Sequence, residues 1–349
     1  MSAADLPPFY PLFHGFPQGC GGRRPVQVLR MPYIPSRGPS FFSGGTLDRA
    51  GHRRMDDAWI EAALNAATTR FAVFWQGQTL IANSGNAEEA ARAVFTSKPA
   101  ADVPWVFLGL QDGAPVFAAN LTGIEAPHDV IAPQEGAFTE LRGITGLLTA
   151  DDATILATGR AMLHWRQQTK FCSVCGHANQ PIRGGYVMRC PNCKTEHFPR
   201  TDPAVIMLIS RNGKLLLGQS HNFPPNSNFF STLAGFVEPG ETLEDAVRRE
   251  VFEETGIRVG EVQYHSSQPW PFPTSLMLGF YGEGLNDDIV LDETEMRAAR
   301  WFSPEEVANS KDCGFGLPPR LSIARSLIED WLAGNNEDWL ANYNQGSSK

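Results

Sequence analysis

The sequence predicts an α+β protein of two or three folding units, built from mixed β-sheets covered by helices. Its 349 residues exceed what one ordinary hydrophobic core supports. Runs of strand-like sequence alternate with single helical patterns along the chain. Hydrophobic residues make up 42% and charged residues 19%, which indicates a folded globular chain and not a disordered one.

The charge and the N-terminus exclude some classes of function. Acidic residues outnumber basic ones by 38 to 29, so a protein that mainly grips long nucleic acid through its phosphates is not expected. A local basic pocket for a small anion remains compatible with this balance. No stretch has the roughly 20 apolar residues that span a bilayer, and residues 1–30 lack the apolar core of a secretory signal. We therefore expect a cytoplasmic protein without a membrane partner.

The first half predicts one sheet domain behind an N-terminal segment. Residues 1–55 are rich in Pro and Gly and are expected to be extended. A domain over 56–168 follows, with Gln-Gly and Asp-Gly turns between strand-like runs and a helix over 151–169. The strands are expected at residues 72–75, 79–82, 106–110 and 115–118.

The second half predicts a small cysteine module over 169–200, a larger domain over 201–335 and a tail over 336–349. An Asn-Gly turn follows the first strand of the larger domain, and a helix is expected over 322–332. The strands are expected at residues 204–209, at 215–217, in a run ending at Ala234, at 262–264 and at 276–281. No internal repeat is visible in the sequence.

Four of the six cysteines form two Cys-x-x-Cys pairs, Cys172 with Cys175 and Cys190 with Cys193. Each pair can present two thiolates to one side, and two pairs complete a tetrahedral site that suits Zn²⁺. Disulfides are not expected in a chain without an export signal. The alternative is four unrelated buried thiols. One Zn²⁺ per subunit held by four protein ligands would be structural, because no position is left for a reacting water.

Acidic residues recur at helical spacing toward the end of residues 235–257. Glu250 and Glu254 stand at i and i+4, and Glu253 projects nearby. Thr242 can cap the start of this helix, and Gly256 can end it in a left-handed conformation.

Local physics opposes such a cluster, because like charges at this spacing repel and the helix C-terminus disfavours anions. Hard divalent cations offset the repulsion by taking carboxylate oxygens together with substrate phosphate. Arg249 is placed to orient Glu241 or a metal-binding carboxylate. The alternative is a solvated acidic face without a ligand.

Residues 235–257 match the pattern G-x5-E-x7-R-E-U-x-E-E-x-G-U at every fixed position, and so resemble the Nudix box. The resemblance implies a Nudix α/β/α sandwich with a mixed sheet and two or three catalytic Mg²⁺ or Mn²⁺ ions per subunit. It implies hydrolysis of a pyrophosphate bond by metal-activated water. The residues it assigns as metal ligands are Glu250, Glu254 and the carbonyl of Ala234, with Glu253 as a further ligand or general base. Glu295 is the candidate acid from outside the box, and an exposed surface acid is the alternative.

Residues 267–275 read SQPWPFPTS. Three prolines in five residues stiffen the chain, so Trp270 and Phe272 are held at little entropic cost. Stiff aromatic rings with polar neighbours suit a planar heterocycle and its ribose, and a loop packed on the core is the alternative.

A SQPWPFP-x-S motif after a Nudix box, with a zinc ribbon before the box, resembles the NADH pyrophosphatases (NAD⁺ diphosphatases). The resemblance implies a Nudix-like N-terminal domain, a homodimer, cleavage of NAD(H) to NMN(H) and AMP, and removal of NAD caps from RNA. It places substrate contacts at Arg142, Phe198, Phe236, Gln268, Pro269, Trp270, Pro271, Phe272, Pro273, Thr274, Ser275 and Ala324. Phe198 is expected to act across the dimer interface, and Gly185 stands where an acid is expected.

Two other hypotheses remain open. One is a Nudix hydrolase for another nucleoside diphosphate, such as ADP-ribose, or one whose main substrate is capped RNA. The other is a catalytically weak module that only senses nucleotides, against which the complete set of glutamates argues.

Overall fold

The structure, a computed structural model, describes residues 38, 40–82, 91–224 and 227–335. Most of the expected N-terminal segment and the whole expected tail therefore lie outside the described residues. Within the described part of the chain, no helix is long and apolar enough to cross a membrane.

The first sheet has the strand order β3-β2-β1-β6-β5, with β4 paired to β1 and β7 paired to β2. β1 and β6 are parallel, and the other pairs are antiparallel. Both expected turns have positive φ at their two central residues, Gln76-Gly77 and Asp112-Gly113. The strands are β1 (Arg70–Trp75), β2 (Gln78–Ala82), β3 (Arg92–Ala93), β4 (Phe95–Thr96), β5 (Trp105–Gln111), β6 (Ala114–Asn120) and β7 (Ala137–Thr139).

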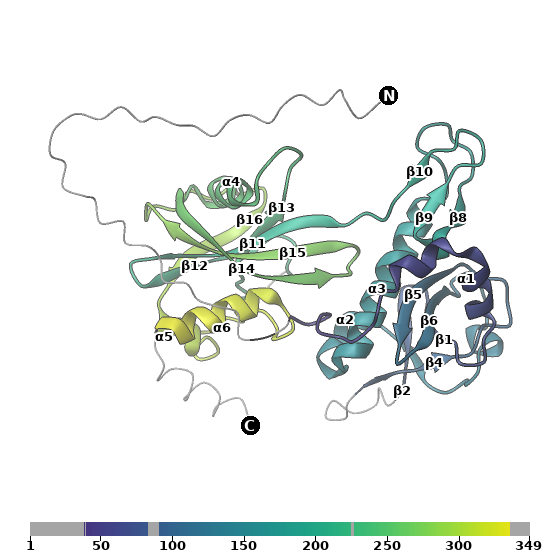
Figure 1. The fold of residues 1–349 in the computed structure, drawn as a ribbon. Coiled ribbons are helices and arrows are strands. Elements are labelled where there is room, and N and C mark those ends of the chain that lie inside the picture. Colours follow the sequence, from purple (N-terminus) through teal and green to yellow (C-terminus); the bar gives the residue numbers. More distant parts are fainter. Residues whose placement is uncertain (1–37, 39, 83–90, 225–226, 336–349) are drawn as a thin grey trace, which may run out of the picture. The chain divides into compact units, whose positions relative to one another are not determined.

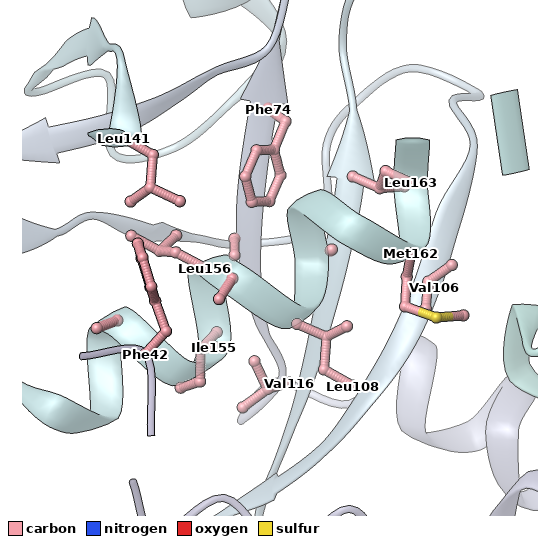
Figure 2. Close-up of a cluster of buried hydrophobic side chains, with 14 of the residues drawn as sticks. Phe42, Phe74, Val106, Leu108, Val116, Leu141, Ile155, Leu156, Met162 and Leu163 are labelled. Carbon is pink, nitrogen blue, oxygen red and sulfur yellow. The ribbon is translucent and has the colours of Figure 1, made fainter. Parts of the chain in front are cut away.

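Helices cover both faces of this sheet. The expected helix is α3 (Ala150–Gln168), and Figure 2 shows its residues Ile155, Leu156 and Leu163 facing the sheet residues Phe74 and Leu108. α1 (Asp57–Leu64), a helix not expected from the sequence, packs on the opposite face.

Phe42 is buried in the α3 cluster. Thr46 also donates its backbone N–H to Asp151 at 2.6 Å. Residues 41–50 form no helix and residues 51–55 form a short 3-10 helix, so the described part of the expected extended segment packs against the cores of the domain.

A three-stranded sheet follows α3, in the order β10-β9-β8. Its strands are β8 (Gln180–Ile182), β9 (Val187–Arg189) and β10 (Glu196–His197). Between β8 and β9, Gly185 has a φ of 88°, and an added Cβ would lie 2.9 Å from the side chain of Val106. The close packing explains why glycine, and not an acid, stands at this position.

The third sheet has the order β14-β15-β11-β12-β16, with β13 paired to β11. Figure 1 shows α4 (Leu243–Thr255) on one side of this sheet and α6 (Ile323–Asn335) on the other, which is the expected sandwich. Residues that alternate along β11 serve the two faces, since Val205 and Met207 pack in the α4 core. The strands are β11 (Asp202–Arg211), β12 (Lys214–Ser220), β13 (Leu233–Phe236), β14 (Val259–Trp270), β15 (Ser275–Gly284) and β16 (Met296–Phe302).

Three features of this sheet differ from the expectation. β14 runs on to Trp270, so the first part of the aromatic stretch is strand, and only residues 271–274 form the turn. Pro269 is tolerated because β14 is an edge strand. The strand β16 and the short helix α5 (Pro304–Ala308) were not expected.

The first and third sheets share one topology. In each, a central strand pairs antiparallel with the next strand and with a short later strand, and parallel with a strand that comes from a hairpin. The parallel strands are β6 and β15, and a helix, α3 or α6, follows each sheet in the sequence. The first sheet lacks a counterpart of the 13-residue α4, because only residues 97–104 separate β4 from β5. The repeat is structural and is not visible in the sequence.

Candidate active site

The acidic helix forms as the local sequence predicts. The Thr242 side chain accepts a hydrogen bond from the backbone N–H of Asp245, and Gly256 ends α4 with a φ of 68°. Ala246, Val247 and Val251 are fully buried against the sheet. Because these apolar residues fix one side of α4, the glutamates project from the other side.

Arg249 organises three carboxylates. Its guanidinium binds both carboxylate oxygens of Glu241, at 2.8 and 2.9 Å, in a bidentate pair. Its Nη1 also donates to Glu250 at 2.9 Å and to Glu253 at 3.0 Å, and its Nη2 donates to the Phe236 carbonyl at 2.9 Å. The hydrogen bonds from Arg249 lower the pKa of Glu241. The expected contact of Arg249 with Glu241 is confirmed, and Arg249 also holds Glu250, one of the predicted metal ligands.

Glu254 is the most unusual carboxylate of the cluster. It is buried, and its Oε2 atom has no hydrogen-bond partner in the described structure. Burial, followed by the charges of Glu250, Glu295 and Glu253, raises its pKa to about 8. Burial also raises the pKa of Glu250, against the opposing effect of Arg249. Native proteins rarely leave a buried carboxylate oxygen unpaired, so this atom indicates a site for a cationic ligand.

β13 comes into direct contact with the acidic helix at Gly235. A Cβ built on Gly235 would lie 1.8 Å from the carboxyl carbon of Glu250. No side chain larger than hydrogen fits there while Glu250 keeps this position. The first glycine of the box therefore makes room for the Glu250 carboxylate.

A cavity of about 780 Å³ opens beside this cluster. Its volume is in the range of small-molecule sites. Seven residues of the predicted site line it: Ala234, Phe236, Glu250, Glu254, Trp270, Ser275 and Glu295. The structure thus brings the box, the acid from outside the box and the aromatic stretch to one place.

The residues present fit divalent cations. The carboxylates of Glu250, Glu254 and Glu295 border one cavity, and the buried Oε2 of Glu254 lacks a partner among the described residues. Hard cations take such oxygen donors. Glu253 does not line the cavity, and its side chain is 56% exposed and held by Arg249.

Only part of the aromatic stretch reaches the cavity. Gln268 is fully buried, and its amide bonds the backbone of Leu321 and Ile323, each at 2.8 Å. Thr274 is buried and donates to Asp202 at 2.9 Å. Of residues 268–275, all of which were expected to line the site, only Trp270 and its cross-strand partner Ser275 line the cavity.

Pro269, Pro271, Phe272 and Pro273 lie outside the lining of the cavity. Arg142, in α2 (Leu141–Ile144), is exposed and lies 5.2 Å from the ring centre of Trp270 and 5.1 Å from that of Phe272. Arg142 does not line the cavity itself, but it lies beside Trp270, which does.

Two predicted contacts lie elsewhere within the subunit. Ala324 is 2% exposed, because the first turn of α6 packs onto the sheet. Phe198 does not line the cavity and has 59% of its surface exposed.

Several residues that line the cavity were not predicted from the sequence. His221, Asn222 and Phe223 form one wall after β12. The guanidinium of Arg297, on β16, holds this wall by donating to the carbonyls of His221 and Phe223 at 2.9 and 3.0 Å. Met277 also faces the cavity, two residues after Ser275 on β15, and strand alternation would have identified it.

The four predicted zinc ligands form one cluster. Their ligand atoms lie within 4.8 Å of one another, which no other group of three or more histidine, cysteine or acidic side chains in the described residues achieves. The Cys175 and Cys193 sulfurs are 3.4 Å apart, and those of Cys172 and Cys193 are 3.6 Å apart. A hydrogen bond from the His177 backbone lowers the pKa of Cys175, which favours the thiolate that binds metal.

Three family profiles match consecutive parts of the chain. Residues 68–165 match the NADH pyrophosphatase-like rudimentary NUDIX domain, and residues 167–198 match the NADH pyrophosphatase zinc ribbon domain. Residues 199–317 match the NUDIX domain. The rudimentary character agrees with the missing counterpart of α4 in the first sheet.

Curated relatives extend this similarity along the chain. The human protein named NAD-capped RNA hydrolase NUDT12 is 34% identical, over 85% of this chain and 74% of its own length. NAD-capped RNA hydrolase NudC of Deinococcus radiodurans is 36% identical, over 80% of this chain and 92% of its own. A crystal structure of a NUDIX hydrolase from Nitrosomonas europaea is 25% identical, with a TM-score of 0.40, and covers 48% of this chain and 93% of that chain.

The fold, the box and the acidic cavity define a Nudix hydrolase. Within that superfamily, the chain belongs to the NADH pyrophosphatase family, with a rudimentary Nudix domain and a structural zinc ribbon before the catalytic domain.

Proposed function

We infer that this protein hydrolyses the pyrophosphate bond of NAD(H) to NMN(H) and AMP, and that it also removes NAD caps from RNA to leave 5′-monophosphate ends. The observation that carries this inference is the partly buried glutamate cluster, which borders the same cavity as the Trp270 indole. The names of the relatives support the NAD-related substrate.

We propose Mg²⁺ or Mn²⁺ as the catalytic cations, held by Glu250, Glu254, Glu295 and the Ala234 carbonyl. When bound, the cations supply charge for the phosphate oxygens and activate the attacking water. Glu254 contributes a buried negative charge to the binding of the cations, and Arg249 fixes the orientation of the Glu250 carboxylate. Glu253, exposed and anchored by Arg249, is a further ligand or the general base.

The cavity walls orient the dinucleotide. Trp270 and Phe236 supply aromatic faces for planar bases, and Ser275 supplies a hydroxyl group. Arg142, close to Trp270, completes this set with a positive charge for the substrate.

We propose that two copies form a homodimer in which Phe198 reaches the partner's cavity. The exposed ring of Phe198 supports this proposal, since it does not line the described cavity of its own subunit. We also propose a cytoplasmic location, where thiols of a Cys₄ zinc site stay reduced.

The test compares kcat/KM for NADH, ADP-ribose and NAD-capped RNA with Mg²⁺ or Mn²⁺, with separation of the products. We expect NADH to give NMNH and AMP, and capped RNA to give NMN and a 5′-monophosphate end. Faster turnover of ADP-ribose than of NADH would assign the site to another nucleoside diphosphate. Binding of NADH without turnover would indicate a sensing module.

A further inference from the structure

The turn between β14 and β15 is held by a side chain of the rudimentary Nudix domain. Arg160, on α3, donates from Nε to the Pro271 carbonyl at 2.9 Å, and from Nη1 to the Gly77 carbonyl. Its guanidinium also lies 5.1 Å from the ring centre of Phe272. One side chain therefore joins the β1–β2 turn to the aromatic turn of the catalytic domain.

Phe272 connects this contact to the cavity. Its ring meets the ring of Trp270 edge to face, with 5.2 Å between centroids, and on another side it meets Phe42 at 5.9 Å. Trp270 lines the cavity, whereas Phe272 does not. Phe272 is therefore the support behind the aromatic wall.

The helix that carries Arg160, α3, is anchored in the hydrophobic core. Leu156 and Leu163, at i−4 and i+3 from Arg160, anchor the same side of α3 on the sheet (Figure 2). The Arg160 side chain is half-buried, and burial lowers its pKa, although a guanidinium stays charged. Such an arginine loses little entropy when it holds two carbonyls and a ring.

We propose that Arg160 is a positioning residue of the active site, which fixes Pro271 and Phe272 and through them the Trp270 wall of the substrate cavity. This inference rests on the proposed function. It gives the rudimentary domain, which has no counterpart of α4, a role in positioning the Trp270 side of the substrate cavity.

Arg160→Ala tests the inference in the full-length protein. A displaced Trp270 weakens substrate binding and leaves the glutamate cluster intact, so we expect the KM for NADH to rise about tenfold while kcat stays within about twofold. Arg160→Lys should recover part of the loss, because an ammonium reaches one carbonyl but cannot stack as a guanidinium does. Gln168→Ala, at the exposed end of the same helix, is the matched control and should leave both constants unchanged.

A double-mutant cycle with Phe272→Ala tests the route. If Arg160 acts through Phe272, the double variant is hardly worse than Phe272→Ala alone. Additive effects on KM, or a fall in kcat at constant KM that reflects loss of folded enzyme, would overturn the inference. Absence of NADH turnover in the unmodified protein would instead overturn the proposed function, so the two failures are distinguishable.

Discussion

Glu254 is a buried carboxylate with a raised pKa and is the clearest functional signal in the catalytic domain. Its carboxylate is buried beside Glu250 and Glu295, with one oxygen unpaired in the described structure. Arg249 compensates Glu250, but no hydrogen bond from Arg249 reaches Glu254. The burial of this acid is understandable if a divalent cation supplies the missing partner.

Glu254→Gln removes the charge and keeps the shape. We expect NADH turnover to fall about a thousandfold or more, because a neutral amide binds divalent cations poorly, while the fold persists. Steady-state kinetics and circular dichroism check this result. Near-normal turnover of the variant would contradict the role of Glu254.

The same residue predicts a pH dependence of stability in chelator-treated protein. The pKa of Glu254 is about 8 in the folded state against an ordinary 4.5, so between these values the folded state holds a proton that the unfolded chain has lost. Stability therefore falls as pH rises through this window. The melting temperature should fall less between pH 5 and pH 8 for Glu254→Gln than for the unmodified protein. Equal differences would contradict the raised pKa.

At the scale of elements, the site depends on the contact between β13 and α4. Gly235 lets the Glu250 carboxylate lie against the strand, and the carbonyl of Phe236 is bound by Arg249. Residues of the Nudix box on β13, Gly235 and Phe236, therefore contact residues of the same box on α4, Glu250 and Arg249.

Gly235→Ala should therefore damage catalysis more than stability. The added methyl group displaces the Glu250 carboxylate, and a displacement on the order of 1 Å costs about a hundredfold in rate. Gly316→Ala is the control, since its added Cβ would make only an ordinary contact, 3.6 Å from Phe229. Kinetics and melting curves of both variants check the prediction, and equal rates for the two would refute it.

The elements that the sequence predicted well are those with local signals. The cap at Thr242 and the glycine at Gly256 mark the ends of α4 without tertiary information. β16 escaped prediction because its sequence, MRAARWF, contains two arginines and only its two end residues are buried, so it lacks an apolar strand pattern. Three prolines suggested a loop at residues 269–273, but an edge position lets β14 continue through Pro269. Gln268 was expected at the substrate, and burial against α6 could not be seen from its polarity.

At the scale of the whole molecule, the rudimentary domain and the catalytic domain share one strand topology but have different roles. The catalytic domain inserts α4 between β13 and β14, whereas the rudimentary domain joins β4 to β5 directly. The sequence showed no repeat, because pairing order is set by burial and by turn positions that many sequences satisfy. The rudimentary domain, which has no counterpart of α4, still contributes Arg142 and Arg160 beside the aromatic turn.

Loss of zinc from the ribbon should lower the stability of the protein without changing the reaction that it catalyses. Cys175→Ser should remove zinc and lower the melting temperature by several degrees, because the cluster closes the small sheet, while the products of NADH cleavage stay the same. Cys313→Ser, which changes an exposed cysteine outside the cluster, is the control. Elemental analysis, melting curves and product separation check this. Protein purified without chelator that contains no zinc would contradict the site.

The most direct test of the account is the rate of NADH hydrolysis in excess EDTA, followed by addition of Mg²⁺ or Mn²⁺ beyond the chelator. The glutamate cluster predicts no measurable turnover in EDTA and recovery of NMNH and AMP formation when the cation is restored. Full-speed hydrolysis in EDTA would contradict the account, because the clustered carboxylates would then have no catalytic cation to bind.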